Sequence, residues 1–108
     1  MSRPPAFDPE VRKALAAEWK GMCWRCGGVG NEYAHRRPRG VRDEHTACYC
    51  NACWLCRTCH RWCHMNPVAS GLAGWTLSRY EDEPWTVPVE TIFGRVLLSC
   101  DRRVTYVK

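Results

Sequence analysis

Two Cys-x-x-Cys pairs constrain the fold of this chain more than any other feature. Cys23 and Cys26 form the first pair, and Cys56 and Cys59 form the second. Four thiolates arranged in this way are a usual ligand set for a tetrahedral structural zinc ion. A chain of 108 residues gains limited stability from an apolar core alone. We therefore predict one small domain in which a structural Zn2+ joins the two pairs.

The cysteine count and the first residues favour zinc over disulfides. The chain has nine cysteines, an odd number, and residues 1–5 are not followed by the apolar run of a secretory signal. We therefore expect a reducing, cytoplasmic setting. A redox dithiol is the alternative, but such a pair normally follows a strand, whereas Cys23 follows a predicted helix. All apolar runs are too short for a bilayer span, so we expect no membrane association.

The N-terminal part, residues 1–20, is predicted to be a loose arm and a helix. Asp8 suits the N-cap and Pro9 the first helical position, so the helix is expected to run from Pro9 to about Lys20. Gly21 is expected to end it. The apolar side chains of this helix fall on one stripe, which comprises Val11, Leu15 and Trp19.

The central part, residues 21–67, is predicted to contain two strands and a helix. A short strand is expected over residues 31–36, followed by a long loop and a second strand over residues 47–52. The helix is expected over residues 57–65, because Pro67 stops it. A long excursion between the strands of so small a domain is more often functional than idle.

The predicted helix after the second cysteine pair has two chemically distinct flanks. At 100 degrees per residue, Cys56, Cys59 and Cys63 point one way, while His60 and His64 lie one turn apart on the adjacent face. One short helix is therefore expected to hold a structural metal on one flank and to present ligands for a second metal on the other.

The C-terminal part, residues 68–108, is predicted to be a β-rich extension without a catalytic constellation. Strand character is expected over residues 74–80 and 87–89, and a hairpin is expected from 94–99 and 103–107. Four of its residues are predicted to pack as core against the central part: Trp75, Trp85, Leu97 and Val104.

The remaining cysteines do not follow a usual zinc-ligand spacing. Four of them form this group: Cys48, Cys50, Cys53 and Cys63. A second zinc site formed by these four is one alternative, but their spacings favour small buried side chains or thiols near the zinc, with Cys63 as a competitor for it. His45 is expected to be a loop histidine or a spare ligand, and Cys100 a hairpin residue. Three tryptophans are expected to form a minicore over the zinc rather than a platform for stacking bases: Trp24, Trp54 and Trp62.

The charge balance permits an acidic partner. The chain has 16 Lys and Arg against 11 Asp and Glu, for a formal net charge of +5. Residues 36–40 form a basic turn in which Pro38 and Gly40 resist regular structure, so His35 is expected at a strand end beside a loop. Side chains at such positions commonly carry function.

The order of His35, Asn51 and His60, framed by the two cysteine pairs, resembles the His-Asn-His (HNH) endonuclease family. Residues 34–40, 55–60 and 74–82 are similar to the zinc-knuckle HNH proteins of actinobacterial phages. This resemblance implies a small α+β fold with a ββα-metal (His-Me finger) core, flanked by an N-terminal helix and a β-rich C-terminal extension.

The resemblance also implies roles for single residues. His35 would be the general base that takes a proton from the attacking water, and Asn51 would hold the loop and orient the imidazole. His60 and His64 would ligate a catalytic divalent ion, which is Mn2+, Mg2+, Ni2+ or Zn2+. Three arginines would contact the backbone of double-stranded DNA: Arg36, Arg37 and Arg39.

Ala34 departs from the family pattern. Many members carry an aspartate or histidine before the general base, where it completes the catalytic metal site. Two imidazoles alone hold Mg2+ poorly, because that ion prefers oxygen ligands. The alternatives are a borderline ion, completion by Glu32, completion by a DNA phosphate, or no cutting at all. Because Glu32 and His35 are three apart on a strand, they are expected on opposite faces, which makes Glu32 a poor substitute unless the strand is bulged.

The function that follows from the resemblance is metal-dependent hydrolysis of DNA, by nicking or cleaving. The implied setting is phage DNA packaging in the bacterial cytoplasm, with the large terminase as a partner. The alternative is a catalytically weak or inactive zinc-knuckle module that binds DNA or the terminase. A purely structural zinc protein would leave the basic turn after His35 unexplained.

Overall fold

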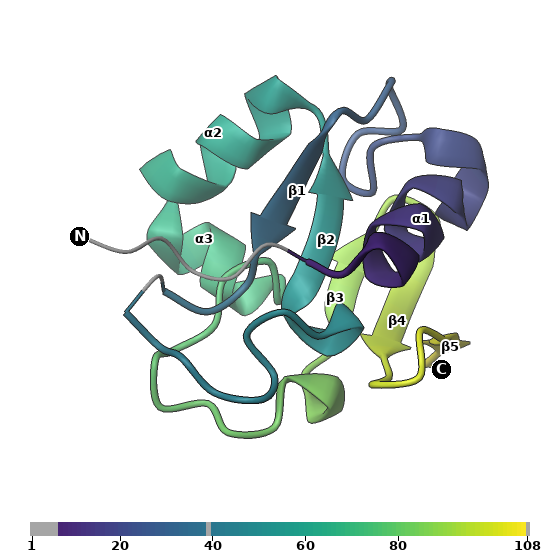
Figure 1. Cartoon of the computed structure of the whole chain (residues 1–108). Coiled ribbons are helices and arrows are strands. Elements are labelled where there is room, and N and C mark those ends of the chain that lie inside the picture. Colours follow the sequence, from purple (N-terminus) through teal and green to yellow (C-terminus); the bar gives the residue numbers. More distant parts are fainter. Residues whose placement is uncertain (1–6, 39, 108) are drawn as a thin grey trace.

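A short antiparallel hairpin forms the centre of this α+β fold. The computed structural model describes residues 7–38 and 40–107. Strand β1 (Glu32–His35) pairs with β2 (Ala52–Leu55), and α2 (Arg57–Met65) follows β2 and contacts both strands. The two strands and the helix thus form a strand–strand–helix unit (Figure 1).

The elements on either side of the hairpin complete the fold. Figure 1 shows α2 and α3 (Pro67–Leu72) on one side of the hairpin, with α1 (Pro9–Ala17) and a second sheet on the other. That sheet is antiparallel, in the order β3-β4-β5. Its strands are β3 (Val89–Thr91), β4 (Gly94–Leu98) and β5 (Val104–Tyr106). No helix in the described part of the chain is long and apolar enough to cross a membrane.

One core joins both sheets and α1. It includes Val11 and Leu15 from α1, Leu55 from β2, and Val96 and Leu98 from β4. Both cysteine pairs contribute one residue to the same cluster, Cys23 and Cys59, and Trp24 joins them. Cys56 is partly buried against this core and Cys26 is exposed, so the four cysteines lie at the edge of the core.

The first helix is shorter than its apolar pattern predicts. Helix α1 ends at Ala17, and a 3-10 segment spans Glu18–Gly21, in which Trp19 and Lys20 adopt positive φ values of 49° and 58°. The ring of Trp19 stacks on Phe93 at 4.8 Å between ring centroids. Trp19 thus makes tertiary contacts at the point where the helix ends early.

The second strand begins later than predicted. The segment Tyr49–Asn51 is a short 3-10 helix, closed by a hydrogen bond from the Asn51 N–H to the Cys48 carbonyl, and β2 starts only at Ala52. The helix predicted over residues 57–65 has those bounds in the structure. Its start is capped, because the Cys56 sulfur accepts a hydrogen bond from the Cys59 N–H.

The strand predicted over residues 74–80 is wrong. Helix α3 occupies residues 67–72, and the chain then runs without a strand to a 3-10 helix at Pro84–Thr86. Isolated backbone hydrogen bonds connect this segment to the rest of the fold, including one from the Leu77 N–H to the Arg36 carbonyl. Of the predicted core residues, Trp75 is buried, whereas Trp85, Leu97 and Val104 are half-buried.

Candidate functional site: a cysteine knuckle beside a histidine pocket

The two Cys-x-x-Cys pairs meet as predicted. The sulfurs of Cys23, Cys26, Cys56 and Cys59 all lie within 4.8 Å of one another, and the Cys26 and Cys56 sulfurs are 3.8 Å apart. Zinc–sulfur bonds of about 2.3 Å place the sulfurs of a tetrahedral site about 3.8 Å apart. The four cysteines therefore have the arrangement of a structural zinc site, which we call the knuckle.

Local backbone geometry aims the first pair. Gly27 has a positive φ of 80°, and its N–H donates to the Cys23 carbonyl at 2.9 Å. The Gly28 N–H in turn donates to the Cys26 sulfur. A residue with a side chain rarely adopts such a φ, which explains the glycine directly after the pair. The knuckle is tied to the hairpin by a bond from the Trp24 N–H to the Trp54 carbonyl.

The thiols of the knuckle do not ionise equally in the protein alone. Burial opposes ionisation of Cys23, but hydrogen bonds with the backbone of Cys56, Cys26 and Arg25 outweigh it and lower its pKa to about 7. Burial raises the pKa of Cys59 to about 12. Since metal ligands bind as thiolates, a bound cation would displace the remaining protons.

Arg25 brings positive charge to the knuckle. Its guanidinium donates to the Cys59 sulfur at 3.5 Å and lies 3.6 Å above the ring of Trp62. A zinc ion with four thiolates carries a net negative charge, which this arginine partly offsets. Trp24 is fully buried, while Trp54 and Trp62 are half-buried against the core, which agrees with a minicore beside the knuckle.

Three histidines line a single pocket beside the knuckle. His35 from the end of β1 and His60 and His64 from α2 surround a cavity of about 420 Å³, together with Ala34. The rings of His60 and His64 are 5.0 Å apart. One face of the His35 ring is covered by Phe7, at 4.3 Å between ring centroids and 22° between planes. The pocket thus joins imidazoles from the hairpin and the helix.

Glu32 contacts His60 of α2. Its carboxylate lies 2.9 Å from Nδ1 of His60 and 3.4 Å from Nε of Arg57. The hydrogen bond with His60 lowers the pKa of Glu32, so this carboxyl stays ionised at neutral pH. Histidine ligands commonly pair one ring nitrogen with a carboxylate while the other binds the ion. With Nδ1 paired to Glu32, Nε2 is the ring nitrogen of His60 that could bind an ion.

Asn51 is buried and fastens the loop between the strands. Its side-chain oxygen accepts the N–H of Arg37 at 2.9 Å, and its amide nitrogen donates to the Thr46 carbonyl at 3.0 Å. Its own carbonyl accepts the Arg36 N–H. These bonds fix the backbone that directly follows His35, so Asn51 positions the end of β1 through the main chain.

Arg36 has a structural role, which corrects its assignment as a DNA contact. The side chain is 1% exposed, and its guanidinium donates to four backbone carbonyls at 2.8–3.1 Å. Burial lowers the pKa of Arg36 to about 10, which leaves it charged at neutral pH. The four acceptors come from distant parts of the chain: Cys50, Gly74, Pro84 and Val87.

Arg37 is likewise engaged within the protein. It is buried and forms a two-pronged ion pair with Asp43, at 2.6 and 2.9 Å. The hydrogen bonds from Arg37 lower the pKa of Asp43 to about 2. The pair braces the loop, so Arg37 too is corrected from a DNA contact to a loop anchor. Arg39, the third arginine predicted to contact DNA, lies outside the described residues.

A second group of ligand-type side chains was missed by spacing rules. His45, Cys48, Cys50 and Cys100 place their ligand atoms within 4.8 Å of one another. In the sequence, Cys48 and Cys50 are separated by one residue and Cys100 stands far away, so no zinc pattern is visible. Cys53 is fully buried and Cys63 is buried at the pocket, as small apolar side chains would be.

Fold and sites together define, over the described residues, a small α+β protein with two sheets and two cysteine-rich groups that could bind metal. No protein-family model matches the sequence, and no similar protein was found among curated proteins or solved structures.

Proposed function

We propose that this protein is a metal-dependent DNA endonuclease of the HNH type. The observation that carries the proposal is the pocket in which His35, His60 and His64 meet. It is built on the strand–strand–helix unit and stands next to a four-cysteine knuckle. Hydrolysis of a phosphodiester requires a base for the attacking water and positive charge at the phosphate, and this pocket offers residues for both.

His35 is the proposed general base. His35 is the last residue of β1, and Asn51 forms hydrogen bonds with the backbone N–H groups of Arg36 and Arg37 that follow it. These bonds hold the backbone at His35 in place and so restrict the position of its imidazole. Phe7 restricts the ring by stacking on one face. A histidine suits proton transfer near neutral pH, and a fixed base is more effective than a mobile one.

His60 and His64 are the proposed ligands of the catalytic ion. Their rings lie one helical turn apart, and Glu32 holds Nδ1 of His60 so that Nε2 remains for the ion. Two imidazoles fit Mn2+, Ni2+ or Zn2+ better than Mg2+, which prefers oxygen ligands. When bound, such an ion supplies positive charge next to the scissile phosphate. Ala34 offers no ligand, so phosphate or water oxygens complete the shell.

The setting in phage DNA packaging, with the large terminase as partner and the bacterial cytoplasm as location, is part of the same proposal. It is supported by the sequence resemblance in residues 34–40, 55–60 and 74–82.

A binding module without catalysis is the second candidate. Two observations favour it: Ala34 stands where a metal ligand is expected, and the ring of Phe7 covers one face of His35. On this alternative the same scaffold grips DNA or the packaging machinery but leaves the phosphodiester intact.

A plasmid assay separates the two candidates. Purified protein is incubated with supercoiled plasmid and Mg2+, Mn2+, Ni2+ or Zn2+, beside His35→Ala and His60→Ala variants. We expect nicking that is strongest with Mn2+ or Ni2+ and that falls at least about 100-fold in the His35→Ala protein, the range assigned to general base catalysis.

Met65→Ala is the matched control, because Met65 lies on α2 near the histidines and its side chain is exposed. It should cut as the unmodified protein does. Equal activity in the unmodified and His35→Ala proteins would overturn the proposal, and a salt-dependent gel shift without cutting would establish the binding module.

A further inference from the structure

The group missed by spacing rules has donor separations suited to a metal ion. The Cys100 sulfur lies 3.9 Å from the Cys50 sulfur and 3.8 Å from Nδ1 of His45. The sulfur–sulfur distance matches the separation of about 3.8 Å that tetrahedral zinc imposes on two sulfur ligands, and the sulfur–nitrogen distance is close to the separation of about 3.6 Å expected for a sulfur and an imidazole nitrogen. Both distances also match the 3.8 Å between the sulfurs of Cys26 and Cys56 in the knuckle. Three thiols and one imidazole form a complete ligand set for a structural zinc ion.

The orientation of His45 is a second, independent observation. Its Nδ1 points to Cys100, while its Nε2 lies 3.6 Å from the Glu44 carboxylate. A carboxylate on the far ring nitrogen is the usual companion of a zinc-bound histidine. The ring of Trp85 packs against the imidazole at 4.8 Å and limits its rotation. His45 is therefore held with one nitrogen toward the three sulfurs.

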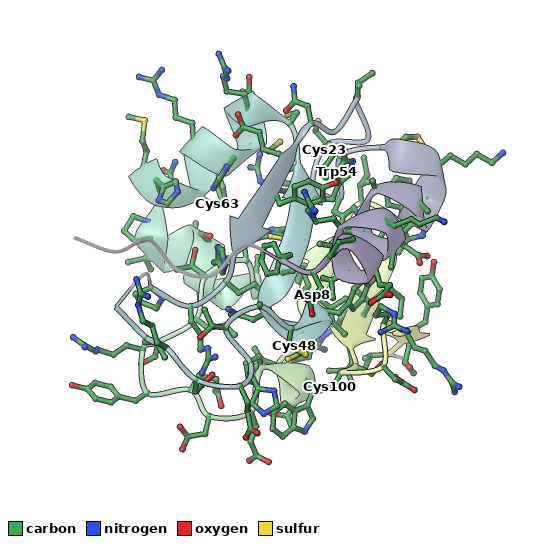
Figure 2. All side chains as sticks on the ribbon, in the orientation of Figure 1. Asp8, Cys23, Cys48, Trp54, Cys63 and Cys100 are labelled. Carbon is green, nitrogen blue, oxygen red and sulfur yellow. The ribbon has the colours of Figure 1, made fainter. Side chains whose placement is uncertain are left out.

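The four residues come from two separate parts of the fold. His45, Cys48 and Cys50 belong to the loop and 3-10 helix before β2, whereas Cys100 lies in the turn between β4 and β5. Figure 2 shows Cys48 and Cys100 next to each other and well away from Cys23 of the knuckle. An ion at this place would join the loop that ends at Asn51 to the C-terminal sheet.

We propose that His45, Cys48, Cys50 and Cys100 form a second structural zinc site, distinct from the knuckle. The site fastens the loop between β1 and β2 to the turn between β4 and β5. It works by ligand exchange only: three thiols lose their protons to solvent as the ion binds, and no oxidant is required. This inference does not depend on the proposed nuclease activity.

Zinc content of the full chain tests the proposal. A protein carrying His60→Ala and His64→Ala is used, so that any ion in the histidine pocket is removed. The protein is purified with reductant, washed with a weak chelator, and analysed by elemental and native mass spectrometry. We expect two zinc ions per chain, one for each four-residue group.

Replacement of single thiols assigns the second ion. Cys100→Ser in the same background should lower the content from two zinc ions to one. Cys63→Ser is the matched control, since Cys63 is a buried cysteine outside both groups, and it should retain two. If the Cys100→Ser protein does not fold, the number of zinc ions bound by the parent protein still tests the proposal.

Three results would overturn the proposal. One is a single zinc ion per chain in the parent protein. Another is an unchanged content of two ions in a folded Cys100→Ser protein. The last is a mass lower by two hydrogens without a second zinc, because that mass indicates a disulfide between thiols of this group. None of these readings involves DNA, so failure here leaves the nuclease proposal untouched.

Discussion

At the scale of single residues, the contact between Glu32 and His60 matters most for the proposed chemistry. Strand alternation predicts that Glu32 and His35 lie on opposite faces, but that comparison concerns only the strand itself. Helix α2 packs against both strands of the hairpin and brings His60 to within 2.9 Å of the carboxylate. Such a contact depends on how α2 packs against the hairpin. The spacing of residues along one strand does not predict that packing.

Glu32→Gln tests this contact. The amide keeps the size of the side chain but removes its charge, so it no longer supports His60 as a ligand. We expect the affinity for Mn2+ to fall about 10- to 100-fold, the usual effect of losing such a partner. The measurement is a calorimetric titration of Mn2+ into the protein after removal of exchangeable ions.

The control for this titration is Glu90→Gln. Glu90 is an exposed carboxylate that pairs with Arg95 on the second sheet. It should leave the Mn2+ affinity unchanged. If Glu32→Gln binds Mn2+ as tightly as the control does, Glu32 has no part in the site.

The basic turn shows a limit of sequence reasoning at the same scale. Arg36 and Arg37 look like an exposed phosphate clamp in the sequence, yet both are buried. The carbonyls that Arg36 binds lie 14–51 residues further along the chain. A run of arginines alone does not reveal such distant acceptors, so the burial of these side chains was not predictable.

At the scale of elements, local signals predicted the short helix, β1 and the hairpin of β4 and β5 to within one residue. They placed β2 too early and predicted a strand over residues 74–80 that does not form. Helix α2 has the expected bounds because Cys56 caps its start and Pro67 opens a new helix soon after its end. The segment over residues 74–80 alternates like a strand but forms none. Its first residue, Gly74, has a positive φ of 81°, which turns the chain away from an extended course.

Gly74→Ala is expected to destabilise the fold strongly. A Cβ at this position would lie 1.9 Å from the Pro88 carbonyl oxygen, and the backbone would keep a left-handed conformation. That conformation alone costs an alanine about 1–2 kcal/mol, so we expect a loss of more than about 2 kcal/mol. Urea unfolding of the zinc-loaded protein measures it.

Gly71→Ala is the matched substitution in α3. A Cβ there meets Thr76 O at 3.7 Å, an ordinary contact, and alanine favours the helix by about 0.5–1 kcal/mol. The two variants should therefore change stability in opposite directions. A Gly74→Ala protein as stable as the Gly71→Ala protein would contradict the described backbone at Gly74.

At the scale of the whole molecule, the cysteine pairs were predictable and the second group was not. The Cys-x-x-Cys spacing is a local pattern, so the pair Cys23 and Cys26 can be assigned to one site with the pair Cys56 and Cys59 from the sequence. His45 and Cys100 meet only because the second sheet packs against the loop before β2. The small α+β class with cysteine-rich groups was therefore predictable, whereas the number of such groups was not.

Removal of bound metal is expected to unfold the protein. Cys23, Trp24 and Cys59 belong to the core cluster, so loss of the knuckle ion would place repelling or protonated thiols inside it. Structural zinc contributes about 10–16 kcal/mol to folding in zinc-finger peptides, which exceeds the stability of most small domains. We expect EDTA with reductant to abolish the helical circular dichroism signal.

Tryptophan emission offers a parallel measurement, because the chain has six tryptophans, several of them near the knuckle. Zinc should restore both signals, and magnesium should not. An unchanged spectrum in protein shown to be free of metal would refute the role of zinc in folding.

The four carbonyl contacts of Arg36 have a consequence for engineering. A truncated protein that stops after α2 would keep all three pocket histidines. The buried guanidinium of Arg36, beside the proposed base, would lose three of its four acceptors, the carbonyls of Gly74, Pro84 and Val87. The strand–strand–helix unit therefore depends on the C-terminal part of the chain and is not expected to fold without it. A transfer of this pocket to another scaffold must include the C-terminal residues that supply these three carbonyls.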